Sequence, residues 1–238
     1  MIKKTGIVFS VAITVLLTIL LLLYNLEFDD SITYEDIKYS NLITTNFSID
    51  TTTRFRSYAD EVVFIKQIQN AVNRFSIIGD GIPMCHERNI KDLYTTKMGL
   101  CYDKSHVIEK ILRVYGFDTR HISIYYYENL IQLIFAVINP YTQSHAVSEV
   151  KTRKGWILVD SLSEIIGLDS NNDPISLGKL REMIERGAAN EDIASNINYD
   201  KKFIFFYGIY SRNGKLYPPY NSIPDFRFCE LKYNFLPK

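Results

Sequence analysis

The chain has 238 residues, a length that suits one folded domain with short appendages. Its 27 basic and 27 acidic side chains balance, so the composition indicates neither a nucleic-acid-binding protein nor an acidic disordered tail. Hydrophobic residues make up 47% of the chain, which is ordinary for a folded protein, although the first segment supplies much of that fraction.

An uncharged apolar segment at residues 5–24 predicts one membrane crossing. A helix of this length, at about 1.5 Å per residue, matches a hydrocarbon core of about 30 Å. Lys3 and Lys4 precede the segment and acidic residues follow it, so the positive-inside rule places residues 1–4 in the cytoplasm and the rest of the chain outside. A cleaved signal peptide is the alternative, but its apolar core would be shorter and would end at a small-residue cleavage site. We therefore expect a single-pass signal anchor in the cell membrane.

Residues 25–55 are predicted to form a linker, because the stretch from Glu27 to Thr53 is polar and rich in threonine, with scattered aromatic residues. The linker could hold the folded domain away from the membrane or pack along the side of that domain. The domain itself is expected over residues 56–238.

A helix is predicted to begin at Ser57 and to continue to about Phe75, because the apolar residues there recur at spacings of three and four. Glycines and a proline at residues 79–83 follow its end. Four amide side chains on this helix are chemically able to donate to an oxyanion: Gln67, Gln69, Asn70 and Asn73. Exposed amides are routine on a solvated helix face, so none of the four is assigned a catalytic role.

Cys85 and His86 are adjacent in the loop that follows. No second ligand pair stands at the spacing of a zinc finger, so we predict no metal site and no cofactor. In an oxidising compartment Cys85 and Cys229 could instead form a disulfide, which would leave Cys101 as the free thiol. Connectivity cannot be read from the sequence, so this pairing stays open.

The next helix is predicted to begin at Cys101, because apolar residues after it recur at helical spacing and Gly116 stands where a helix ends. Cys101 would then lie in the first turn, near unpaired backbone N–H groups and the positive end of the helix dipole. That environment favours the thiolate, which is the nucleophilic form. A lone cysteine is by default a small buried hydrophobe, so this stretch alone does not establish a nucleophile.

Strands are predicted over residues 119–127, which include His121 on an edge strand, and over residues 130–138. Residues 144–150 and 155–160 are predicted to pair as a hairpin, with Lys154-Gly155 in the turn.

A polar loop at residues 169–174 follows the hairpin, and its Asp/Asn spacing is partly that of a calcium loop, but the central glycine and terminal glutamate are absent. A short helix closed by Gly187 and a strand over residues 203–210 come next. A turn at Asn213-Gly214 and a rigid aromatic loop at residues 218–225 are the last predicted features.

Cys101, His145 and Asp160 form a candidate catalytic group, because the hairpin places the histidine and the carboxylate on neighbouring strands. A thiolate can attack a carbonyl, an imidazolium can protonate the leaving amine, and a carboxylate can fix the imidazole tautomer. His106 is a poor candidate for the base, because five helical residues turn its side chain away from Cys101. A core or surface histidine remains the plainer alternative for His145.

The order and flanks of these residues resemble the transglutaminase-like superfamily of papain-fold cysteine enzymes, over about residues 97–161. In that family Gly-x-Cys begins a helix that ends in Gly-Φ-x-x-Arg, and His-Ala and Trp-x-x-x-Asp follow. The matching pieces are Gly99 to Cys101, Gly116 to Arg120, His145-Ala146 with Glu149, and Trp156 with Asp160. Val147 is a departure, because many members have tryptophan two residues after the histidine.

The resemblance implies an α+β fold for the domain at residues 56–238, with a papain-like, transglutaminase-like core in which a nucleophile helix packs on an antiparallel sheet. The transmembrane helix predicted from the apolar run at residues 5–24 precedes this domain. The resemblance also implies thiol-dependent acyl transfer or hydrolysis at an amide bond. Cys101 would be the nucleophile, His145 the general base and acid, and Asp160 the orienting carboxylate.

The expected substrate is a peptide or protein amide, or a cell-envelope polymer, and no nucleic acid is expected as a partner. Hydrolysis and aminolysis use the same three residues, so the sequence does not choose between them. The alternative is a non-catalytic binding or scaffold module of a cell-envelope assembly with the same fold.

Overall fold

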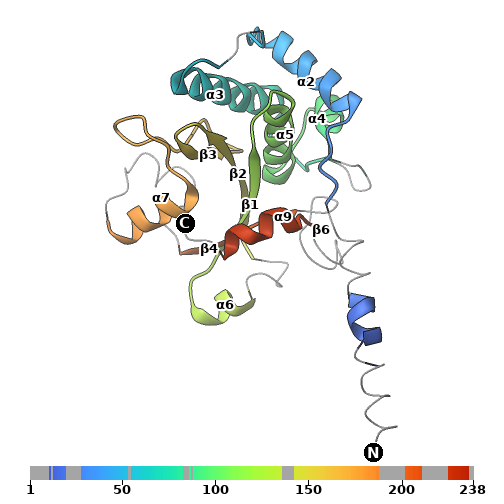
Figure 1. Cartoon of the computed structure of the whole chain (residues 1–238), viewed down its shortest axis with the longest axis vertical. Helices are drawn as coiled ribbons and strands as arrows, with labels where there is room; N and C mark the ends of the chain where they lie inside the picture. The colour runs from blue at the N-terminus through green and yellow to red at the C-terminus, as the bar shows by residue number, and fades with distance from the viewer. Residues whose placement is uncertain are drawn as a thin grey trace, which may run out of the picture.

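A four-stranded antiparallel sheet of order β3-β2-β1-β4 runs through the molecule (Figure 1). The computed structural model describes residues 11, 13–19, 28–52, 55–82, 86, 88–135, 142–187, 202–210 and 225–235. The strands of the sheet are β1 (Thr119–Tyr126), β2 (Ser144–Thr152), β3 (Gly155–Asp160) and β4 (Phe203–Tyr207). The expected mixed α+β fold with an antiparallel sheet is therefore confirmed.

Helices cover both faces of this sheet. On one side α3 (Tyr58–Phe75) and α5 (Cys101–Val114) contact the sheet, and α2 (Tyr34–Asn46) and α4 (Ile90–Thr96) pack against α5 (Figure 1). Apolar residues of α3 and α5 form the first core with Val150, Ile157 and Val159 of the sheet. On the other face α7 (Leu177–Glu185) packs into a second core with β1, β2, β3 and β4. Successive strand residues point to opposite faces, which is why one strand supplies both cores.

The end of the chain packs beside β4. A two-stranded sheet of β5 (Ile209–Tyr210) and β6 (Asp225–Phe226) is followed by α9 (Phe228–Leu231) and the short η2 (Lys232–Asn234). The strand expected over residues 203–210 is confirmed but broken between β4 and β5 at Gly208, whose φ is +71°. The turn at Asn213-Gly214 lies outside the described residues, as does the aromatic loop apart from Asp225.

The predicted boundaries of α3 and α5 are confirmed. Ser57 caps α3 by accepting a hydrogen bond from the Asp60 N–H, and the Asp60 carboxylate accepts one from the Ser57 N–H. Helix α5 begins at Cys101, and Gly116 follows its end with a φ of +89°, a conformation that favours glycine. The hairpin and the short helix before Gly187 are confirmed in the same way.

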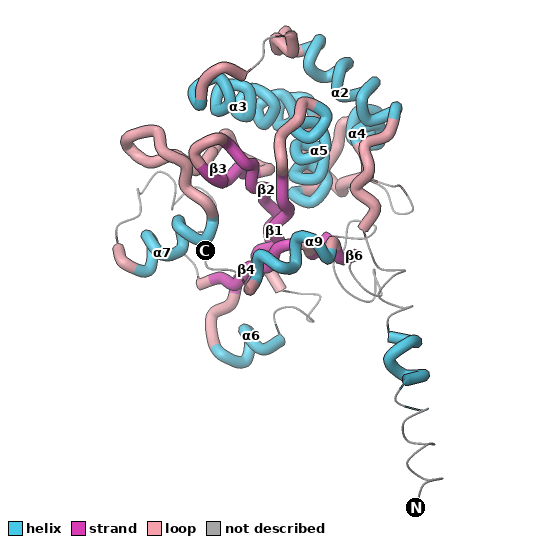
Figure 2. Tube along the Cα trace, viewed as in Figure 1, coloured by secondary structure: helices cyan, strands magenta, loops and turns pink. Residues whose placement is uncertain are grey.

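The strand predicted over residues 130–138 is wrong, because residues 130–135 form helix α6 (Leu130–Phe135), which Figure 2 draws at the end of the molecule remote from α3. Local polar side chains explain the helix. The Asn129 side chain accepts a hydrogen bond from the Gln132 N–H at 3.0 Å, and the Gln132 side chain accepts one from the Glu128 N–H at 2.7 Å. Residues 136–138 lie outside the described part of the chain.

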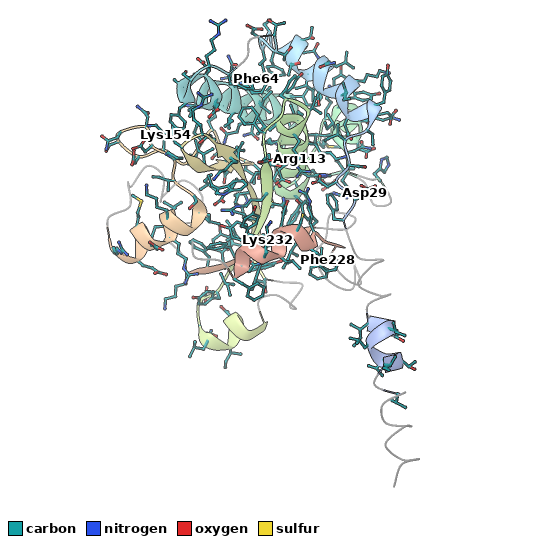
Figure 3. All side chains as sticks on the ribbon, viewed as in Figure 1. Asp29, Phe64, Arg113, Lys154, Phe228 and Lys232 are labelled. Atoms are coloured by element: carbon teal, nitrogen blue, oxygen red, sulfur yellow. The ribbon has the colours of Figure 1, made fainter. Side chains whose placement is uncertain are left out.

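The linker expected over residues 25–55 also needs correction, because residues 34–46 form helix α2 and pack along the side of the domain. Ile43 is fully buried there, and Asp36 forms a buried ion pair with Lys110 at 2.9 Å. Figure 3 labels Arg113, one turn further along α5, which pairs with Asp30. Of the two expected arrangements, packing along the domain is the one observed.

The membrane anchor predicted at residues 5–24 falls mostly outside the described residues. Within that segment, residue 11 and residues 13–19 are described, and they are helical. Among all the described residues, no helix is both long enough and apolar enough to cross a membrane.

Candidate active site

Cys101 is the first residue of α5, and its thiol is free and half-buried. The N-cap residue, Leu100, has no side-chain acceptor for the N–H groups of the first turn. Its own N–H donates to the carboxylate of Asp103, the N3 residue, at 2.9 Å. Asp103 also accepts the Ile82 N–H at 3.1 Å and binds Arg88 at 2.6 Å. The fully buried carboxylate thereby holds the start of the helix, and with it Cys101, against the loop before α4.

His145 and Asp160 meet across the hairpin. The Nε2 atom of His145 lies 2.8 Å from Oδ2 of Asp160, and both side chains are buried. The second oxygen of Asp160, Oδ1, accepts the N–H groups of Leu162 at 2.7 Å and Ser163 at 2.9 Å. These bonds satisfy a carboxylate that would otherwise be costly to bury, and they aim its other oxygen at the imidazole.

Cys101 lies close enough to His145 to contribute to the pKa of the imidazole. Burial lowers the pKa of His145, but the charge and hydrogen bond of Asp160, together with those of Cys101, outweigh burial and raise this pKa to about 10. The site therefore favours an imidazolium held between a carboxylate and a sulfur. The structure pairs His145 with Asp160 directly and places Cys101 near the imidazole.

Gln69 binds the backbone of Asp160 and of the loop after β3, a role that the sequence did not predict. It is fully buried on α3, and its Nε2 donates to the carbonyls of Asp160 at 2.8 Å and Ile165 at 2.6 Å. Asn73 donates to the Ser163 carbonyl at 2.8 Å. The expectation of a solvated amide face holds for the exposed Gln67 and is wrong for Gln69, which supports the loop after β3.

The other histidines have partners of their own. His106 is buried, its Nδ1 lies 3.0 Å from the Arg88 carbonyl, and burial lowers its pKa well below 6.5. His121 is also buried, 2.8 Å from Glu109, on a strand between β2 and β4; its expected position on an edge strand was wrong. His86 lies in a loop and contacts Asp92 at 3.0 Å.

Three further residues of the sequence pattern form a cluster in which Arg120 and Glu149 are buried and Trp156 is half-buried. The guanidinium of Arg120 binds the carboxylate of Glu149, with Nε at 2.7 Å from Oε2. The guanidinium also lies 4.1 Å from the ring centroid of Trp156, 4.3 Å from that of Tyr207 and 4.4 Å from that of Tyr233. This cluster ties β1, β2, β3 and β4 to η2, so these pattern residues stabilise the fold.

Among the described residues, no group of three or more His, Cys, Asp or Glu side chains is placed to hold a metal ion. In the polar loop Asp169 accepts the backbone N–H groups of Asn171 and Asp173, and Asp173 pairs with Lys154. Cys229 is an exposed free thiol, so the pairing with Cys85 is not observed, and Cys85 itself lies outside the described residues.

The chain was compared with family models, curated proteins and solved structures. Residues 49–161 match the family model described as the transglutaminase-like superfamily, which covers slightly less than half of the chain and includes all three site residues. The search of curated proteins gives no significant match.

Among solved structures, one match is a crystal structure described as that of a candidate cysteine protease from Cytophaga hutchinsonii. Its sequence identity is 18% and its TM-score is 0.37, and the match covers 57% of this chain and 40% of that chain. The chain thus spans well under half of that protein's length, and at this score the likeness carries no argument about activity.

Proposed function

We propose that this chain is a cysteine enzyme that carries out acyl transfer or hydrolysis at an amide bond of a peptide, a protein or a cell-envelope polymer. The observation that carries the proposal is the buried pair of His145 and Asp160, 2.8 Å apart, with Cys101 at the start of helix α5 close enough to affect the imidazole pKa. The match of residues 49–161 to the transglutaminase-like superfamily supports a cysteine-dependent enzyme at that broad level.

The chemistry follows from these three groups. The thiolate of Cys101 attacks the amide carbonyl carbon, a C–S bond forms, and the carbonyl electron pair moves to oxygen. N–H groups in the first turn of α5 have no acceptor within the helix, which suits them to stabilise that oxyanion. As the C–N bond breaks, His145 gives its proton to the leaving amine, and Asp160 keeps the ring oriented throughout.

The acyl group then passes to water or to a second amine. His145 takes a proton from that nucleophile as it attacks the thioester, and the C–S bond breaks to restore the thiolate. Water gives a peptidase or amidase, whereas an amine gives a transglutaminase-like transfer.

Trapping the acyl-enzyme tests this proposal. The full chain in detergent is incubated with glutamine-containing peptides, with or without a fluorescent primary amine, and quenched in acid. We expect an intact-protein mass raised by one acyl group, located on Cys101 by peptide mass spectrometry. Cys229→Ala, which removes an exposed thiol on α9, should keep the adduct, and Cys101→Ala should lose it. Peptide binding without any adduct would favour the non-catalytic module.

We further propose that the N-terminal apolar segment anchors the enzyme in the cell membrane with its domain outside. The proposal depends on the uncharged run at residues 5–24 with Lys3 and Lys4 before it. Protease added to intact cells, or to spheroplasts where an outer membrane exists, should remove the domain while a cytoplasmic marker survives. A domain that stays protected in sealed cells would contradict this topology.

A further inference from the structure

A side-chain hydrogen bond joins the neighbours of the nucleophile and of the base. Tyr102 directly follows Cys101 on α5, and Ser144 directly precedes His145 at the start of β2. The Tyr102 hydroxyl lies 2.6 Å from Ser144 Oγ, which is a short distance even for an O–H···O bond. The two elements that must present Sγ and the imidazole to each other are therefore linked one residue away from both groups.

Further along, β2 is attached to α5 a second time. Ser148 donates to the Ser105 carbonyl at 3.2 Å and to the Glu109 carboxylate at 2.7 Å. Ser144 and Ser148 are four residues apart, so they point to the same face of the strand. Ser105 and Glu109 lie at least one helical turn beyond Cys101. The bonds of Ser148 therefore do not hold the start of α5 against the end of β2 that carries His145, whereas the bond between Tyr102 and Ser144 does.

The surroundings of Tyr102 keep its phenol protonated, so that it can donate a hydrogen bond. Burial, above all, and the charge at Cys101 raise the pKa of Tyr102 well above its ordinary value near 10. The Tyr102 hydroxyl next to Cys101 therefore stays neutral, and it can share its proton with Ser144.

We propose that Tyr102 and Ser144 form a positioning pair that sets the distance between Cys101 and His145. This inference depends on the proposed function, since it assigns these residues a role in aligning its nucleophile and base. Neither residue contacts the reacting bond in the proposal; both act by holding α5 and β2 in register. An error of about 1 Å in such an alignment is enough to reduce a rate by a large factor.

The test measures the alkylation of Cys101 by iodoacetamide in the full chain from pH 5 to pH 10, read at the Cys101 peptide by mass spectrometry. Tyr102→Phe and Ser144→Ala should each slow the reaction at pH 6 about tenfold and move the pH profile towards that of an ordinary thiol. The double variant should be no slower than either single variant, because each single substitution already breaks the same hydrogen bond.

Tyr115→Phe is the matched control, since it removes a hydroxyl that bonds Thr44 and Asn41 at the other end of the same helix. It should change the unfolding temperature without changing the pH profile. Variants of the pair that react as fast as wild type at pH 6 would overturn the pair while leaving the proposed function standing. A wild-type Cys101 that itself behaves as an ordinary thiol would overturn both.

Discussion

Replacing His145 by alanine is expected to slow the alkylation of Cys101 at pH 6 by about a hundredfold. An ordinary thiol with a pKa of about 8.5 is almost entirely protonated at pH 6, so it reacts slowly. In the wild type the imidazolium of His145 stands beside the sulfur, and its pKa of about 10 keeps it protonated throughout the neutral range. The measurement is the second-order rate with iodoacetamide, read at the Cys101 peptide.

The course of the rate with pH makes this prediction specific. In the wild type the rate should already be high at pH 6 and should change little until His145 loses its proton near pH 10. In His145→Ala it should rise about tenfold per pH unit towards pH 8.5. Cys229 reacts in the same sample as an exposed thiol, and its rate should be the same in both proteins.

Asp160→Asn supplies the graded comparison. It keeps a hydrogen-bonding side chain at the position 2.8 Å from His145 but removes the charge that helps to raise the imidazole pKa. We expect a smaller loss than with His145→Ala, because the base is weakened and misoriented but not deleted. Identical pH profiles for wild type and His145→Ala would show that the ion pair does not form, and the binding-module alternative would then be preferred.

Local chemistry explains why the sequence predicted the centre of this site. The start of α5 and its end before Gly116 depend on neighbours within a few residues, as does the hairpin around Lys154-Gly155. These elements place His145 and Asp160 on neighbouring strands and Cys101 at the start of a helix. The pattern of residue types therefore carried most of the candidate site.

Long-range contacts explain what the sequence could not predict. Gln69 looks like any amide on a helix, and its role depends on carbonyl groups more than 90 residues away. Helix α2 has little amphipathic pattern, and buried ion pairs such as that of Asp36 with Lys110 hold it against the domain. The apolar run after Asn129 fits a strand or a helix equally well, and only the capping amide side chains distinguish the two.

The residues of the pattern that surround the site divide into two groups with different physical roles. His145 and Asp160 pair directly with Cys101 near the imidazole, whereas Arg120 binds Glu149 and contacts aromatic rings. One oxygen of Glu149 binds Arg120, and the other accepts the Leu177 N–H at the start of α7, at 2.6 Å. The sequence motif therefore includes residues that stabilise the fold as well as candidate catalytic residues.

Replacing Arg120 by alanine should consequently cost about 3 to 5 kcal/mol of unfolding free energy, the second large effect that we expect. The substitution leaves the fully buried Glu149 carboxylate without its cation and removes the guanidinium from between the rings of Trp156 and Tyr207. Urea unfolding of the full chain in detergent, followed by circular dichroism, measures the loss.

The exposed pair of Arg181 with Glu185 on α7 supplies the control, because Arg181→Ala should cost no more than about 0.5 kcal/mol. Replacing Arg120 by methionine and Glu149 by leucine together should recover much of the stability, since no buried charge is then left unpaired. Equal losses for Arg120→Ala and Arg181→Ala would contradict the structural role of this cluster.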